Sequence, residues 1–154
     1  MLSQCDFLDV AGFTMQRLNT GVLLVSRVPD GRPNVMAISW GYIGFQWNKP
    51  IFVVPVRKTR FSHGLIAARK EFVVCVQPES MDDAMEFCGT KSGREVDKLA
   101  ALGLGTMSVP GVETPAVAGS AVAYACRVIH TAESEPRSNH TLFFGEILGV
   151  FEGK

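Results

Sequence analysis

The amino-acid sequence predicts a mainly β protein in which an antiparallel sheet curls into a closed or half-closed barrel, with short helices between the strands. Three observations support this fold class. Runs of β-branched and apolar residues are bounded by Gly, Pro, Asn and Asp, short turns join successive runs, and helical spacing of apolar residues is confined to short segments. The 154 residues fit one domain, residues 1–154, that is large enough to bury a core.

The first three predicted strands form two hairpins. Gly21–Arg27 is a predicted strand, Pro29–Pro33 supplies turn residues, and Asn34–Phe45 is predicted to be a second, long strand. A further turn at Gln46–Pro50 leads to the β-branched third strand, Ile51–Val56. Two hairpins in succession make a meander, which favours an antiparallel sheet over parallel βαβ units.

Helices are predicted in the middle of the chain. Phe61–Arg69 has apolar residues at helical spacing. Ser80 is the predicted N-cap of a helix over Met81–Phe87, whose first turn carries two aspartates where the helix dipole favours anions. A short helix over Glu95–Leu102 should end at Gly103.

Three more strands complete the predicted barrel, which makes six in all. Glu71–Gln77 is the fourth, and Ala121–Ile129 and Thr141–Phe151 are the last two, joined by the polar segment Thr131–His140. Gly105–Gly119 is rich in Gly and Pro and should be an irregular connection.

Charge and hydropathy narrow the classes of function. Fifteen acidic residues balance fifteen basic ones, which disfavours a nucleic-acid partner. The chain has neither a signal peptide nor an apolar run of roughly 18 residues, so we expect a cytoplasmic protein that does not bind membranes. The apolar fraction of 47% is compatible with a large core or with an apolar surface that a subunit or cofactor covers.

The four cysteines do not suggest a metal or redox site. Cys5, Cys75, Cys88 and Cys126 show neither CxxC spacing nor a zinc-type cluster. We interpret them as buried free thiols that act as small hydrophobic residues, which fits a reducing compartment.

The second predicted strand carries a candidate ligand-binding face. Alternation places Asn34, Met36, Ile38 and Trp40 on one side and Ser39 on the other. Asn34 and Trp40 would lie roughly 20 Å apart, at about 3.3 Å per residue, which is near the length of an extended mononucleotide with a three-ring flavin. The alternative is that these side chains fill the barrel core.

The segment Arg57–His63 is a candidate anion site. Three cations and two hydroxyls precede the predicted helix, whose first backbone N–H groups lack intrahelical partners. Arg57, Thr59 and Ser62 together suit a phosphate, because arginine offers a bidentate fork and hydroxyls offer hydrogen bonds. The alternative is a solvated basic loop.

Two further segments are weaker candidates. Gly89–Arg94 followed by Lys98 could form a second polar clamp, although it lacks the P-loop spacing, and surface charges are the alternative. His140, at the start of the last strand, could bind a ligand oxygen or cap the loop. The sequence contains no GxSxG elbow or three-glycine dinucleotide fingerprint, and its histidines are too scattered to suggest a metal triad.

Four blocks in this order resemble the flavin reductase-like, flavoredoxin-type family. They are Asp30–Trp40, Arg57–His63, Cys88–Lys98 and His140–Glu146. The resemblance runs from about Thr20 to Glu152, which is nearly the whole chain. It favours ligand binding over core packing for the second strand, and over a solvated loop for the basic segment.

The resemblance implies a six-stranded antiparallel FMN-binding split β-barrel of Greek-key type, usually a homodimer with the flavin near the subunit interface. It implies that Asn34 and Trp40 face the flavin, that Arg57, Thr59 and Ser62 hold its phosphate end, and that two more residues approach the flavin. The full set of expected cofactor-binding residues is Asn34, Met36, Ile38, Ser39, Trp40, Arg57, Thr59, Ser62, Lys98 and His140. The sequence stops at Lys154, whereas many members continue with a segment that helps to cover the flavin, so the resemblance does not fix how closed the site is or how it binds nicotinamide.

Three functional hypotheses follow. In the first, the protein is an NAD(P)H:FMN oxidoreductase in which a transiently bound nicotinamide gives hydride to the flavin, a reaction that needs no acid–base residue of the protein. In the second, FMN is a prosthetic group that exchanges electrons with a redox partner protein. In the third, the barrel uses the same groove for another ligand or only for dimerisation.

Overall fold

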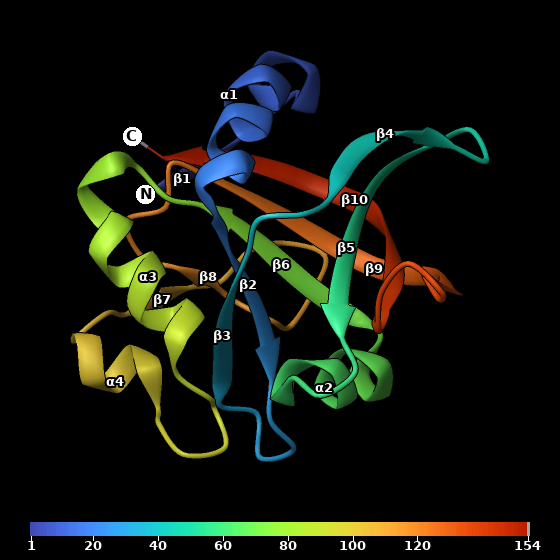
Figure 1. The fold of residues 1–154 in the computed structure, drawn as a ribbon. Coiled ribbons are helices and arrows are strands. Elements are labelled where there is room, and N and C mark those ends of the chain that lie inside the picture. The colour runs from blue at the N-terminus through green and yellow to red at the C-terminus, as the bar shows by residue number, and fades with distance from the viewer. Residues whose placement is uncertain (154) are drawn as a thin grey trace.

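The computed structural model describes residues 1–153, and Lys154, the last residue of the predicted domain, lies outside them. Short helices alternate with strands of one dominant sheet (Figure 1). The elements are β1 (Leu2–Cys5), α1 (Phe7–Thr20), β2 (Val22–Arg27), β3 (Pro33–Ile38), β4 (Tyr42–Gln46), β5 (Lys49–Arg57), α2 (Phe61–Arg69), β6 (Glu71–Val76), the 3-10 helix η1 (Glu79–Met81), α3 (Asp82–Thr90), α4 (Lys98–Leu102), β7 (Thr106–Met107), β8 (Ala116–Val117), β9 (Val122–Glu133) and β10 (His140–Gly153).

The main sheet is an antiparallel, split barrel. Within residues 1–153 it has eight strands, in the order β3-β2-β6-β9-β10-β5-β4, with β1 paired to β10. Its two edge strands, β3 and β4, are consecutive in the chain, so the backbone crosses from one edge to the other within residues 39–41. The mainly β, antiparallel fold class is confirmed, although the sheet has more strands than the six predicted.

The prediction of one strand over Asn34–Phe45 is wrong, because β3 ends at Ile38 and a separate strand, β4, begins at Tyr42. Gly41 has φ +146°, and a Cβ atom there would lie 2.8 Å from the carbonyl oxygen of Val53. Glycine adopts this backbone region without steric strain, whereas other residues rarely do. The alternation of side chains between the two faces of the strand ends there. Hence Trp40, 57% exposed, does not share the buried environment of the residues that precede the break.

Helix α1 was not predicted from the sequence. The Asp6 side chain caps it by accepting a backbone N–H of its first turn at 2.9 Å. Its buried face includes Val10 and Leu18 but also Thr14, whose hydroxyl lies within hydrogen-bonding distance, 2.5 Å, of the Tyr124 hydroxyl. A polar residue in the buried stripe weakens the apolar periodicity that identifies a helix.

The other helices differ from expectation in their bounds. Helix α2 begins and ends where predicted. Ser80 lies inside η1 and is not an N-cap, because α3 begins at Asp82, and α3 extends through Thr90, beyond the predicted end at Phe87. Helix α4 is shorter than predicted because the Asp97 side chain caps it, whereas Gly103 ends it in the left-handed region, as expected.

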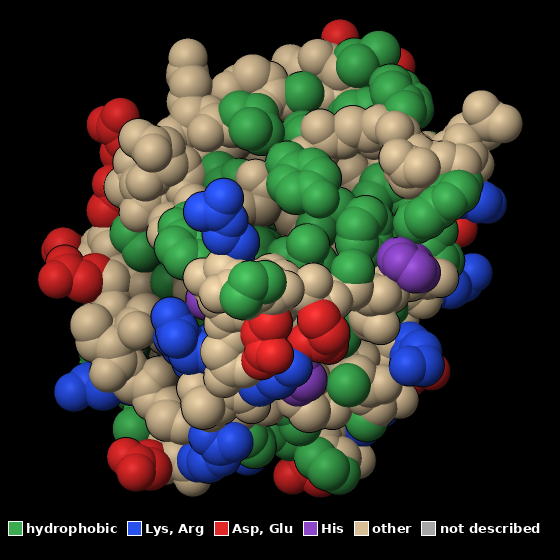
Figure 2. Space-filling model, turned by 45° about the vertical axis from the view of Figure 1, so that its right-hand side comes forward, with side chains coloured by type: hydrophobic (Ala, Val, Ile, Leu, Met, Phe, Trp, Pro, Cys, Tyr) green, Lys and Arg blue, Asp and Glu red, His purple; other side chains and the backbone are tan. Residues whose placement is uncertain are grey.

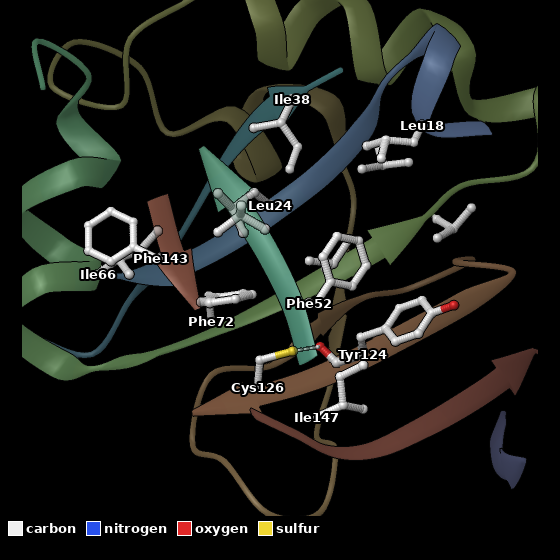
Figure 3. Packing of buried hydrophobic residues seen from close by; sticks show 14 of the residues in the cluster. Leu18, Leu24, Ile38, Phe52, Ile66, Phe72, Tyr124, Cys126, Phe143 and Ile147 are labelled. Carbon is white, nitrogen blue, oxygen red and sulfur yellow. Dashed lines mark hydrogen bonds between the residues drawn. The ribbon is translucent and has the colours of Figure 1, made fainter. Parts of the chain in front are cut away.

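Two apolar layers hold the barrel together. The inner core takes alternate residues from the strands and is joined by Leu18 of α1 and Ile66 of α2, which lie at opposite ends of the barrel (Figures 1 and 3). The opposite faces of β2, β3, β6 and β9 pack against α3, α4 and residues 109–117. All four cysteines are free, with Cys5 half-buried and the others buried. Among residues 1–153, no helix is both long and apolar enough to cross a membrane.

Candidate functional site

A groove opens at the seam of the split barrel, where the end of β3 faces β5 and the start of β10. It encloses about 190 Å³. Its lining comes from the β3 edge and the crossover on one side and from the β5–α2 corner and β10 on the other: Met36, Ala37, Ile38, Ser39, Trp40, Pro55, Arg57, Arg60 and His140.

A smaller pocket continues the groove toward the start of α2. The two cavities share Met36 and Arg60 in their linings, so they lie next to each other, and the inner one encloses about 10 Å³. The other lining residues of the inner pocket are Phe61, Lys91, Ser92, Gly93 and Lys98. The row of residues from β3 is therefore accessible from one side, although Met36 and Ile38 also belong to the inner core.

The inner end of the groove is strongly cationic. Neither Arg57 nor Arg60 takes part in any of the ion pairs found among residues 1–153. Burial lowers the pKa of Arg60, and the charge of Arg57 lowers it further. Two guanidinium groups that repel each other and lack a carboxylate partner favour an anionic ligand between or beside them.

The start of α2 adds to this positive potential. Arg60 is its N-cap residue, and no side chain accepts a hydrogen bond from the first turn. Ser62, the second residue of the helix, is 2% exposed and lines the inner pocket. An uncapped helix N-terminus with a hydroxyl in its first turn is a favourable environment for a phosphate.

Lys98 closes the inner pocket from the side of α4. Its ammonium group donates to the carbonyl oxygens of Val35, at 2.7 Å, and Cys88, at 2.8 Å. Burial lowers the pKa of Lys98 to about 8, and the charge of Arg60 acts in the same direction. The ammonium group thus ties the β3 edge to α3 and contributes a cation that titrates near neutral pH.

An aromatic pair marks the open end of the groove. The rings of Trp40 and His140 have their centroids 4.8 Å apart, with 43° between their planes. His140 Nδ1 lies 2.9 Å from the Ser138 hydroxyl. Burial lowers the pKa of His140, and the charge of Arg57 lowers it further, so this imidazole is neutral at pH 7 and above. Together the two tilted rings offer a partly apolar, aromatic wall.

The structure brings most of the predicted residues together. Six line the outer groove and two the inner pocket: Met36, Ile38, Ser39, Trp40, Arg57 and His140, and then Ser62 and Lys98. Thr59 lines neither cavity: it is exposed, and its carbonyl oxygen accepts a hydrogen bond from Arg94 at 3.2 Å. Asn34 does not line the groove either, because its amide is buried and donates to Ser26 and Ser62.

The expected set of cofactor-binding residues did not include Arg60, nor Lys91, Ser92 and Gly93, although these last three lie in the Gly89–Arg94 segment that was a weaker candidate. Arg60 could have been found, because it immediately precedes the predicted helix and its N-cap position aims it at the same anion site as Ser62. The Gly- and Lys-containing loop was a candidate from its composition, but its position beside the pocket depends on the packing of the α3–α4 connection over α2. Among residues 1–153, no group of three or more His, Cys, Asp or Glu side chains could hold a metal ion.

Comparisons with known proteins match nearly the whole chain. The sequence model of a family described as the flavin reductase like domain matches residues 15–154. A curated relative, an uncharacterized protein of Archaeoglobus fulgidus, is 32% identical over 131 residues, which cover 85% of this chain and 71% of the relative.

Solved structures share the fold and part of the sequence. The flavoredoxin of Desulfovibrio vulgaris (Miyazaki F) superimposes with a TM-score of 0.79 and 28% identity over 87% of this chain and 69% of that one. An FMN-binding protein of Thermus thermophilus, solved with bound 1-cyclohex-2-enone, gives a TM-score of 0.75 and 27% identity over 86% of this chain and 69% of its own.

Proposed function

The chain belongs to the flavin reductase-like family, and from this premise we propose that it binds FMN in the groove and transfers hydride from NAD(P)H to the flavin. One observation carries the proposal: the groove adjoins a small pocket at an uncapped helix N-terminus, and two arginines without an ion-pair partner line the groove. A ligand that suits this groove is a flat, largely apolar ring system with an anionic tail. The similar protein of Thermus thermophilus is named for FMN binding, which supports this choice.

The residues present fit FMN at both ends. The ring would be held along Met36, Ile38 and Trp40, beside the neutral imidazole of His140. The phosphate would be held by Arg60 and Ser62 at the start of α2, with Arg57 and Lys98 supplying further positive charge. The buried hydroxyl and the partly desolvated cations make these contacts stronger than they would be in water.

When bound, FMN supplies the hydride-accepting centre, so the protein need not provide an acid or a base for that transfer. The chain's own task is to bind the phosphate, to fix the plane of the ring and to exclude water from one side of it. A reduced nicotinamide would approach from the open side near Trp40, which is 57% exposed. Without a dinucleotide-binding fold, the protein would hold NAD(P)H only transiently.

The first test is a visible spectrum of the purified protein titrated with FMN, followed by anaerobic NADH or NADPH. We expect micromolar or tighter FMN binding and bleaching of the flavin band with at least one donor. A protein that takes up no FMN at micromolar concentration would refute the flavin site. Bound flavin that neither donor bleaches would refute the reductase activity alone.

A second candidate is an electron carrier that holds FMN as a prosthetic group. The similarity to the flavoredoxin of Desulfovibrio vulgaris favours it. This candidate predicts that the bound flavin ignores NAD(P)H but is reduced by a small redox partner protein such as a ferredoxin. The same anaerobic titration, repeated with reduced ferredoxin, distinguishes the two.

We also propose that the protein forms a homodimer through the aromatic face of β4 and β5. Tyr42, Phe45 and Trp47 are 49%, 66% and 48% exposed. Figure 2 shows hydrophobic side chains gathered on the side where this hairpin lies. Such a patch is unusual on a monomer. The groove, at about 190 Å³, is smaller than the roughly 300–1,000 Å³ of typical ligand sites. A second copy would cover the aromatic face and enlarge the groove.

Phe45→Asp is expected to convert the dimer into a monomer, because a carboxylate in a desolvated interface costs several kcal/mol. Light scattering after gel filtration should then fall from about twice the chain mass to 16.7 kDa. Met15→Asp, on the exposed face of α1, is the matched control and should stay dimeric. A wild-type protein that is monomeric while saturated with FMN would refute this interface. The cytoplasmic location and the lack of a nucleic-acid partner stay predictions.

A further inference from the structure

We propose that Asn34 is a positioning residue that fixes the Ser62 hydroxyl as a hydrogen-bond donor toward the anion in the inner pocket. The inference rests on the proposed phosphate site and deepens it. It gives Asn34 a different task from the flavin contact expected from the sequence, since Asn34 lines neither cavity.

The Asn34 amide is held between two serines. Its Nδ2 atom donates to Ser26 Oγ at 3.2 Å and to Ser62 Oγ at 2.9 Å. The three residues are 7%, 1% and 2% exposed, respectively. Ser26 is the cross-strand partner of Asn34 in the β2–β3 pair, and Ser62 comes from α2. The amide therefore joins the sheet to the helix that begins the anion site.

Gly93 leaves room for the other end of this amide. A Cβ atom at position 93 would overlap Asn34 Oδ1 and lie 2.8 Å from the Phe61 ring. The α3–α4 loop thus packs its backbone directly against the amide and limits how it can move. The Asn34 side chain has two amide hydrogens, and the two serines use both.

This arrangement leaves the single donor position of the Ser62 hydroxyl free. A hydroxyl can donate one hydrogen bond and accept two. Ser62 Oγ accepts from Asn34, and no other side-chain hydrogen bond involving Ser62 occurs within residues 1–153. Because Ser62 lines the inner pocket, its O–H is available to donate to an anion there. In the opposite arrangement, Ser62 would donate to the Asn34 oxygen and offer a phosphate only lone pairs.

A double-mutant cycle tests the coupling, with dissociation constants for FMN and riboflavin measured by fluorescence titration. Asn34→Ala and Ser62→Ala should each weaken FMN roughly 3- to 10-fold, the range of one hydrogen bond. The double variant should bind FMN no more weakly than Ser62→Ala alone. Riboflavin, which lacks the phosphate, should change less than about twofold. Ser62→Thr keeps the hydroxyl and should restore most of the FMN affinity.

The outcomes separate this inference from the function on which it rests. A wild-type protein that prefers FMN to riboflavin, but in which the two single effects multiply, would overturn the role of Asn34 and leave the phosphate site intact. A wild-type protein with no preference for FMN would overturn both.

If Asn34→Ala does not fold, Asn34→Asp keeps the side-chain shape but cannot donate. The Asp variant is compared in the Ser62 and Ser62→Ala backgrounds, because this removes the effect of its charge. A loss of FMN affinity at least about threefold larger with Ser62 present supports the proposal, and equal losses in both backgrounds refute it.

Discussion

Arg60→Gln is expected to weaken FMN binding about 10- to 150-fold while leaving riboflavin nearly unchanged. Arg60 is half-buried, lines both cavities and occupies the N-cap position of α2. A hydrogen bond to a charged group contributes about 1.5–3 kcal/mol, and each 1.4 kcal/mol is a factor of ten in affinity. The ratio of the two flavin dissociation constants, measured by fluorescence titration, isolates the phosphate contribution.

The Arg60→Gln variant should be at least as stable as the wild-type protein. The pKa of Arg60 is lowered by burial and by the charge of Arg57, so the free protein holds two repelling cations near each other. Removing one of them relieves that repulsion, and the melting temperature should stay the same or rise. Arg127→Gln, on the exposed side of β9, is the control for a general loss of positive charge. Equal weakening of FMN and riboflavin would mean that Arg60 shapes the groove and does not bind the phosphate.

Local patterns predicted the regular parts of the fold. The strand over residues 22–27 and helix α2 were predicted almost to the residue, because each has the periodicity of its own structure and a turn or loop at its ends. The inner core takes every second residue of β6 and β9, as expected for strands covered on both faces.

Long-range closure of the barrel could not be predicted. Residues 33–46 alternate like one strand, but the chain leaves one sheet edge and joins the other at Gly41. The strand ends because Gly41 has a positive φ and packs closely against the carbonyl oxygen of Val53, a residue of another strand. Helix α1 was missed for a similar reason, since a tertiary hydrogen bond to Tyr124 replaces an apolar contact at Thr14.

In the candidate site, too, local patterns were predicted and long-range contacts were not. The anion end was predicted from one continuous segment, Arg57–His63, in which the basic residues adjoin the helix start. The groove wall was predicted from the right segment but with the wrong geometry. The groove runs along the unpaired edge of β3 and the crossover after it, so consecutive residues from Met36 to Trp40 line it, where one continuous strand would present every second residue. The task of Asn34 depends on its contact with α2, which alternation along a strand cannot show.

FMN affinity is expected to change little between about pH 7.5 and 8 and to fall by up to about tenfold per pH unit above pH 8. The free protein holds Lys98 with a pKa of about 8, lowered by burial from 10.5. A phosphate in the inner pocket would favour the ammonium form and raise that pKa. Below pH 8 the group is charged with or without ligand, so proton binding does not change. Above pH 8 the free protein loses the proton, and binding must take one up.

Titration of the FMN phosphate or of the histidines does not explain the expected fall in FMN affinity above pH 8. The second pKa of a phosphate monoester is about 6, so FMN is a dianion throughout the range from pH 7.5 to 9.5. Burial lowers the pKa of both His63 and His140, so neither imidazole gains a proton there. Riboflavin provides the control for every group that acts on the ring, and its affinity should show no comparable fall.

Calorimetry of the wild-type protein at pH 8.8, in two buffers of different ionisation enthalpy, measures the proton uptake directly. We expect between about half and one proton taken up per FMN bound, and close to none for riboflavin. Lys98→Met should abolish the uptake, although it also leaves the carbonyl groups of Val35 and Cys88 without their donor and should lower the unfolding temperature. The proton uptake of the wild-type protein is therefore the measurement that tests whether the phosphate lies beside Lys98. If FMN binds without proton uptake and with constant affinity up to pH 9.5, the phosphate does not lie beside Lys98.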